Sequence, residues 1–314
     1  MDALVYVGPQ QLVVRDEPAP EPRPGEVVVS VLAAAICGSE LNGVRHNDPS
    51  RKPPLIMGHE FVGRRSDTGE LVAVNPLVAC AECDACRRSQ SNLCRARELI
   101  GVHRSGGFAE LVSVPAANCH ELPAGCSTLA AVLVEPLANS WHLWDLSLAD
   151  TSSRVGVIGA GAIGLLAAIV GTHSGARRVT LADISDVRRG TARAAGVEDV
   201  VEQLEDEYDV IIDAVGANDT RRSSVSRLRP GGRAVWEGLH DGETPIDGRD
   251  IVRREISVVG SFAYTDEEFA RAVATITLVS EQWVEGVPLA EGARAFQSLM
   301  VSTHPAVRTV LVPA

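Results

Sequence analysis

The sequence is poor in positive charge, and in lysine above all. Lys52 is the only lysine among 314 residues, which we interpret as coding bias, and the formal net charge is −12. Binding to the phosphates of a nucleic acid needs basic patches on the protein surface. This charge balance therefore argues against a nucleic-acid partner.

Long apolar runs are also missing. The most apolar stretch, residues 155–170, is short for a membrane span and is interrupted by glycines. The first residues, Met1–Val5, lack the basic and apolar regions of a signal peptide. We therefore expect a cytoplasmic protein that does not contact a membrane.

Cysteine is scarce, but most of it is clustered. Four of the seven cysteines form a C-x2-C-x2-C-x7-C pattern, whereas Cys119 and Cys126 have no partner motif. An odd count with this spacing favours a reducing compartment over a disulfide framework. Four thiolates in so short a span suit a tetrahedral, structural Zn²⁺. The alternative is a set of buried thiols that bind nothing. The predicted ligands are Cys80, Cys83, Cys86 and Cys94.

The hydrophobic pattern changes between the first third of the chain and the remainder. Short apolar runs at 27–32, 71–74 and 111–114 lie between turn residues, which predicts a barrel-like β domain. From residue 154 strands and helices alternate, which predicts a parallel sheet. The predicted strands are 155–158, 179–182, 210–212 and 233–236, and the predicted helices are 162–170 and 188–195. We expect one long helical stretch at 266–278, then a final strand at 308–312 that returns to the first domain.

A G-x-G-x-x-G fingerprint follows the predicted strand at 155–158 and opens a helix. Gly159 permits a tight turn, Gly161 lets the backbone approach a pyrophosphate, and Gly164 lets the helix pack against the strand. Asp183, at the end of the next strand, can accept hydrogen bonds from the adenosine ribose, which favours NAD over NADP. The nearby Arg188 weakens that preference. The alternative is a glycine-rich helix start without a ligand.

A second set of metal-ligating residues flanks the cysteine cluster: Cys37, the segment 58–60 (Gly-His-Glu) and the segment 135–137 (Glu-Pro-Leu). Together with the fingerprint, these residues resemble the zinc-containing medium-chain alcohol dehydrogenases. The glutamate at 135, where simple-alcohol enzymes have cysteine, is similar to the sorbitol, threonine and aminocyclitol dehydrogenases. Taken singly, Cys37 could be a small buried hydrophobe and His59 a satisfied core histidine.

The resemblance implies an α/β fold of two domains. A groES-like β-barrel catalytic domain with a zinc lobe would span 1–137, a Rossmann coenzyme domain 138–262, and a segment returning to the catalytic domain 263–314. It also implies one catalytic and one structural zinc, NAD or NADP, and a homodimer or homotetramer. The implied coenzyme-binding residues are Gly159, Gly161, Ala162, Ile163, Gly164, Asp183, Ile184, Arg188, Val215 and Leu239.

Roles in catalysis are implied in the same way. Cys37 and His59 would ligate the catalytic zinc, Glu60 would be a third ligand, and Glu135 a ligand or a neighbour of the ligands. Zinc with an open position binds an alcohol oxygen as a Lewis acid and promotes hydride transfer to the nicotinamide. Ser39 would first accept the substrate proton, and Glu40, where the family usually has aspartate, would orient His59.

Two departures from the family pattern limit the resemblance. Asn42 replaces the histidine that usually ends the proton relay, and either His46 or water could complete the path. Ala263 stands where sorbitol dehydrogenases have an arginine near the substrate, which disfavours a plain hexitol or a phosphorylated sugar.

The sequence thus predicts a zinc-dependent, NAD-linked dehydrogenase acting on a small secondary alcohol or the corresponding ketone. Polyols, sugars, aminocyclitols and β-hydroxy amino acids are the candidate substrates. One alternative is a zinc-free protein resembling quinone reductases, which should lack both metal sets. The other is a non-catalytic protein that binds zinc or nucleotide.

Overall fold

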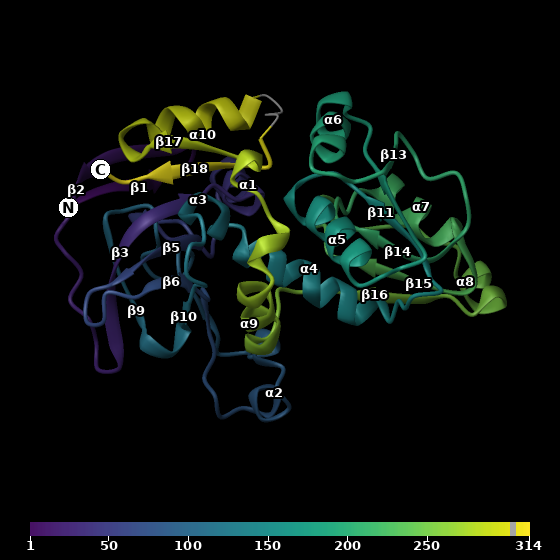
Figure 1. Ribbon diagram of the computed structural model, residues 1–314, viewed down its shortest axis with the longest axis horizontal. Coiled ribbons are helices and arrows are strands. Elements are labelled where there is room, and N and C mark those ends of the chain that lie inside the picture. Colours follow the sequence, from purple (N-terminus) through teal and green to yellow (C-terminus); the bar gives the residue numbers. More distant parts are fainter. Residues whose placement is uncertain (302–305) are drawn as a thin grey trace. The chain divides into compact units, whose positions relative to one another are not determined.

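The computed structural model describes residues 1–301 and 306–314, which form two compact units. Unit 1 comprises residues 1–135 and 265–314, and unit 2 comprises the continuous segment 136–264 (Figure 1). Unit 1 is thus built from two parts of the chain, with all of unit 2 between them in sequence.

Unit 1 is organised around antiparallel β structure, as its alternating apolar residues predict. One sheet has the order β10-β6-β5-β3-β18-β17, with β9 paired to β3, and a second has the order β2-β1-β4. The final strand β18 lies antiparallel to β3 and parallel to β17. The bounds are β1 (Asp2–Gly8), β2 (Gln11–Asp16), β3 (Glu26–Ala35), β4 (Leu55–Ile56), β5 (Glu60–Arg65), β6 (Leu71–Val74), β9 (Leu111–Pro115), β10 (Cys119–Glu121), β17 (Val284–Pro288) and β18 (Arg308–Val312).

Helices in unit 1 are few and short. The first two, α1 and α2, lie next to the sites described below, and so does the hairpin formed by β7 (Leu77–Val78) and β8 (Glu98–Leu99). The predicted helical stretch 266–278 is not continuous, because the α-helix ends at Ala274 and residues 276–278 form a 3-10 turn. The α-helices are α1 (Gly38–His46), α2 (Asp84–Arg87), α3 (Thr128–Ala131), α9 (Asp266–Ala274) and α10 (Gly292–Val301).

One continuous apolar core holds unit 1 together. Tyr6, Phe108 and Phe296 are fully buried in it, and the rings of Phe108 and Phe296 meet edge to face at 5.7 Å. Phe296 comes from α10, so the end of the chain covers residues contributed by its beginning. Burial of such large apolar surfaces is the main stabilising contribution.

Unit 2 is a six-stranded, wholly parallel sheet of order β13-β12-β11-β14-β15-β16, with helices packed on it. The order reverses between β11 and β14, which places the ends of both strands at a switch point. The bounds are β11 (Arg154–Ile158), β12 (Arg178–Ala182), β13 (Asp199–Val201), β14 (Tyr208–Asp213), β15 (Leu228–Trp236), β16 (Ser257–Gly260), α4 (Val134–Ser147), α5 (Ala162–His173), α6 (Asp186–Ala194), α7 (Asn218–Ser226) and α8 (Gly248–Arg254).

No helix in the described part of the chain combines the length and the apolar character needed to cross a membrane.

Candidate metal and coenzyme sites

The four clustered cysteines meet in a small lobe next to the hairpin β7–β8. Their sulfurs lie 3.5 Å apart for Cys83 and Cys86, 3.5 Å for Cys80 and Cys94, and 4.0 Å for Cys80 and Cys86. A tetrahedral zinc with Zn–S bonds of about 2.3 Å needs sulfurs about 3.8 Å apart. The donor set and its spacing therefore fit a structural zinc ion.

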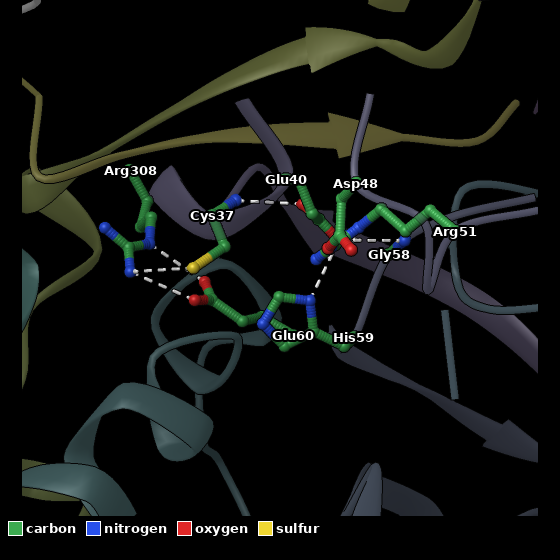
Figure 2. A network of polar contacts seen from close by, with 8 residues as sticks. All are labelled: Cys37, Glu40, Asp48, Arg51, Gly58, His59, Glu60 and Arg308. Carbon is green, nitrogen blue, oxygen red and sulfur yellow. Dashed lines mark hydrogen bonds and ion pairs between the residues drawn. The ribbon is translucent and has the colours of Figure 1, made fainter. Parts of the chain in front are cut away.

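A second possible ligand group lies where β3 meets β5. Ala35 and Glu60 are paired across these strands, so Cys37, just past the end of β3, lies close to His59 and Glu60. One ligand atom from each of these residues falls within 4.8 Å of the others. Figure 2 shows the Cys37 sulfur, the Glu60 carboxylate and the His59 ring converging. One thiol, one imidazole and one carboxylate are suitable donors for a catalytic zinc with an open position.

Glu40 fixes this group by three hydrogen bonds. Its Oε2 accepts the Cys37 backbone N–H at 3.0 Å, and its Oε1 accepts that of Gly58 and contacts His59 Nδ1, both at 2.9 Å (Figure 2). Glu40 is also the third residue of α1, whose N-cap is Cys37, so the contact to Cys37 is part of a capping box. A glutamate is long enough to serve both the helix start and the histidine. The His59 Nε2 then remains available to a metal ion.

Arg308 is a component of this site that the sequence analysis did not identify. From β18 its Nε contacts Glu60 Oε2 at 2.9 Å, its Nη2 contacts Glu60 Oε1 at 3.0 Å, and Nη2 lies 3.8 Å from Cys37 Sγ. A half-buried arginine at the start of a mostly apolar strand is a signal that the sequence offers only in part, because burial is not visible in it. Its partner is 248 residues away, so spacing could not identify the pair.

At Arg308, Glu60 and His59, neighbouring charges shift the pKa more than burial does. Burial opposes the charged form of Arg308, but Glu60, Cys37 and Glu135 outweigh it and raise the pKa of the guanidinium. Burial alone would raise the pKa of Glu60, yet Arg308 brings it below the usual value. For His59, burial acts downward but Glu40 and Cys37 raise its pKa well above the ordinary one. Glu60 is therefore a buried carboxylate kept ionised by Arg308.

The other predicted catalytic residues lie at varied distances from this group. Glu135 is buried in the first turn of α4, near Arg308, but is not among the three residues whose ligand atoms converge. Ser39 is exposed in the first turn of α1 and His46 is exposed in the last. A helical rise of 1.5 Å per residue separates Ser39 from His46 by roughly 10 Å along the axis. The two side chains are thus not in direct contact along the helix.

The glycine fingerprint of unit 2 forms the turn between β11 and α5. Gly159 has φ +99°, and a Cβ at Gly164 would lie 1.7 Å from the Gly159 carbonyl oxygen, so only glycine fits there. Beyond the chain neighbours and the backbone of α5 itself, no atom of the described residues lies within 4 Å of a Cβ placed on Gly161, the N-cap of α5. Gly161 therefore leaves open space in front of the N–H groups of Ala162 and Ile163, as an anion site requires.

Asp183 stands at the end of β12 beside this turn. Its Oδ2 accepts the Ala160 backbone N–H at 2.7 Å, and its Oδ1 accepts that of Ser185 at 2.8 Å. Arg188 Nη1 lies 3.7 Å from the Asp183 carboxylate and is about half exposed. The remaining predicted residues also lie at the carboxyl edge of the sheet: Val215 would meet a Cβ on Gly159, and Ile184 and Leu239 are 81% and 80% exposed.

The comparisons with known proteins agree with this geometry. The alcohol dehydrogenase GroES-like domain matches residues 23–124, and the zinc-binding dehydrogenase domain matches residues 162–277. L-Galactonate-5-dehydrogenase of Escherichia coli K12 is 33% identical, with 86% of each chain covered. L-Threonine 3-dehydrogenase of Streptomyces avermitilis is 33% identical over 80% of each.

Solved structures give the same result for the fold. A short chain alcohol dehydrogenase of Escherichia coli CFT073, complexed with NADH, superimposes with a TM-score of 0.91, 26% identity and 99% coverage of both chains. Galactitol-1-phosphate dehydrogenase of Escherichia coli gives a TM-score of 0.91 at 25% identity, with 100% of each chain covered. The predicted combination of groES-like and Rossmann domains is confirmed, and this chain belongs to the zinc-containing alcohol dehydrogenase family.

Proposed function

We propose that this protein oxidises a small secondary alcohol with NAD, using zinc held by Cys37, His59 and Glu60. The observation that supports it best is the convergence of these three donors within 4.8 Å in a chain that also carries the glycine fingerprint. Zinc bound there would supply Lewis acidity to a substrate hydroxyl. Unit 1 would be the catalytic domain and unit 2 the coenzyme domain, close to the predicted division at 137 and 262.

The surrounding residues would prepare the site for this reaction. Glu40 holds the His59 ring in one orientation, with Nδ1 engaged and Nε2 directed to the metal. Arg308 keeps Glu60 ionised, so that the carboxylate can act as a ligand or remain paired with the guanidinium. Glu135 would lie beside the ligands as a further carboxylate.

Proton release would begin at Ser39. Its exposed hydroxyl can pass the substrate proton to water without crossing the protein. Asn42 would then not block the reaction, and His46, at the other end of α1, would not be required. We therefore favour water over His46 as the outlet of the relay.

The substrate would be a polyol, a sugar, an aminocyclitol or a β-hydroxy amino acid. Glu135 supports this class, and so do relatives named for L-galactonate and L-threonine. Asp183 supports NAD as the preferred coenzyme, while Arg188 leaves NADP as an alternative. We further propose a cytoplasmic homodimer or homotetramer, the oligomer on the family resemblance and the compartment on the odd cysteine count with metal-type spacing.

Both alternatives are less well supported. A zinc-free quinone-reductase-like protein should lack the two metal groups, and this chain has both. A non-catalytic zinc or nucleotide-binding protein would not need the converging Cys37–His59–Glu60 donors together with the coenzyme fingerprint, and this chain has both.

The test is NADH formation by zinc-replete protein with polyols, aldoses, aminocyclitols, threonine and simple secondary alcohols, repeated with NADP. We expect turnover of one class, abolished in Cys37→Ser while NADH binding is retained. Cys126→Ser, at a half-buried thiol outside both groups, should behave as wild type. Turnover that survives Cys37→Ser would overturn the site assignment, and a wholly inactive protein with two bound zinc ions would favour the non-catalytic alternative.

A further inference from the structure

A buried arginine fastens the loop that follows β15 in unit 2. From α7, Arg221 donates to three acceptors of this loop: Nη2 to the Gly238 carbonyl at 2.9 Å, and Nη1 to the Asp241 carbonyl at 2.8 Å and to Thr244 Oγ1 at 3.1 Å. The side chain is 9% exposed and its guanidinium lies 5.3 Å from the centre of the Trp236 ring. Arg221 thus holds both ends of the segment 238–244.

The same loop is tied to the neighbouring loop after β14. Asp241 donates its backbone N–H to the Gly216 carbonyl at 3.0 Å, and its Oδ2 accepts the backbone N–H of Asn218 at 2.8 Å. A Cβ on Gly238 would lie 2.0 Å from the Val215 carbonyl carbon, so the two loops touch backbone to backbone. A displacement of one loop would therefore displace the other.

These two loops carry an exposed and a half-buried apolar side chain, Leu239 and Val215. Leu239, between the two anchored carbonyls, is 80% exposed, and Val215 reaches the fingerprint turn at Gly159. A large apolar side chain on a firmly held loop, at the carboxyl edge of a parallel sheet, is suited to contact a ligand. Leu239 is held in place by bonds that Arg221 makes on either side of it.

The strand order decides which part of a dinucleotide would meet this loop. Asp183 follows β12, on one side of the fingerprint strand β11, whereas Val215 and Leu239 follow β14 and β15 on the other. A dinucleotide with its pyrophosphate at α5 and its adenosine ribose at Asp183 must therefore extend its second half toward β14 and β15.

We propose that Arg221 is a positioning residue for the nicotinamide half of the coenzyme: by fixing the loop 238–244 it places Leu239 and Val215 against that half. This inference rests on the proposed NAD-binding function. In this proposal Arg221 acts through the loop and not by contact with the coenzyme, so its effect is indirect and confined to one half of the ligand.

The experiment compares two ligands on folded protein. NADH spans both halves of the site, whereas AMP occupies the adenosine half alone. We expect Arg221→Met to weaken NADH binding about tenfold, the equivalent of losing one good hydrogen bond to a charged group, with AMP affinity unchanged. Arg222→Met is the matched control, because that exposed neighbour on α7 pairs only with Asp219 in the described structure, and both affinities should stay at wild-type values.

A more conservative variant keeps the proposal testable if the Arg221→Met protein does not fold. Arg221→Lys keeps the charge but loses the fork that reaches three acceptors, so we expect a folded protein with a smaller loss of NADH affinity. NADH affinity within twofold of wild type in both variants, or equal losses for NADH and AMP, would overturn the proposal. Wild-type protein that binds neither ligand would instead overturn the coenzyme site, and the inference with it.

Discussion

The guanidinium of Arg308 pairs with both carboxylate oxygens of Glu60, at 2.9 Å and 3.0 Å, inside unit 1. Glu60 is fully buried, so removal of the arginine leaves a charge without its partner. We expect Arg308→Met to lower the free energy of unfolding by about 3–5 kcal/mol, measured by urea denaturation of protein whose Cys37–His59–Glu60 group is free of metal. The double variant Glu60→Gln/Arg308→Met should recover part of that loss. A double variant no more stable than Arg308→Met would show that the pair is not the cause.

Removal of one ligand from the four-cysteine lobe should affect one metal ion only. We expect Cys94→Ser to reduce the zinc content by about one ion per chain and to expose the lobe to proteolysis between β7 and β8, because the metal ion would join all four cysteines of this segment. Elemental analysis and limited proteolysis measure both effects. Cys126→Ser should retain two ions. A Cys94→Ser protein with the full zinc content would contradict the structural site.

Glu40 offers a test of how the histidine is held. A glutamine there has one acceptor oxygen in place of two, so one of the Cys37 and Gly58 N–H groups must face an amide N–H₂. We expect Glu40→Gln to weaken the second zinc site by roughly 10–100-fold in competition with a chelator. Glu98→Gln, at an exposed carboxylate, is the control. Unchanged zinc affinity would mean that Glu40 serves only the start of α1.

Two glycines of one motif should respond differently to the same substitution. A Cβ at Gly164 would collide with the Gly159 carbonyl, whereas one at Gly161 meets no protein atom. We expect Gly164→Ala to destabilise unit 2, and Gly161→Ala to leave the melting temperature unchanged while weakening NADH binding at least about tenfold, because the methyl occupies space needed by the pyrophosphate. Calorimetry and NADH titration separate these effects. Full NADH affinity in Gly161→Ala would place the pyrophosphate elsewhere.

Asp213 predicts a pH dependence of stability. Burial raises the pKa of this carboxyl, against the opposing hydrogen bonds from Gly216, Val215 and Thr220. Compared with the unfolded chain, the folded protein binds the proton of Asp213 more tightly. The contribution of Asp213 to stability is therefore most favourable below the ordinary pKa of 3.8, and it is lost as the pH rises through the higher pKa of the folded protein. The stability of Asp213→Asn relative to wild type should thus increase from pH 4 upward, as read from urea midpoints. A flat difference would show an unshifted carboxyl.

Local spacing explains most of what could be predicted from the sequence. Cys80 to Cys94 are close in sequence, so a metal can join them whatever the remaining fold. The parallel sheet followed from alternating strands and helices, and the strands 71–74 and 308–312 were placed at their observed bounds. These features depend on neighbouring residues, for which periodicity is informative.

Features that depend on distant pairing could not be predicted. Arg308 acquires its role only because β18 lies beside β3, and Arg221 only because α7 packs next to the loop after β15. The contact of the Glu40 carboxylate with the Cys37 backbone N–H depends on how far the glutamate side chain extends. The helix predicted to Leu278 ends at Ala274, where the β-branched residues Thr275, Ile276 and Thr277 have low helical propensity.

Strand β18 gives unit 1 a fixed order of assembly during protein synthesis. Unit 2 is one uninterrupted segment and can fold as soon as residue 264 has left the ribosome, but the sheet of unit 1 still lacks β17 and β18. Cys37, His59 and Glu60 therefore emerge into the cell long before Arg308 does. During that interval the Glu60 carboxylate has no guanidinium partner from Arg308, so a bound metal ion would supply the positive charge that joins it to Cys37 and His59.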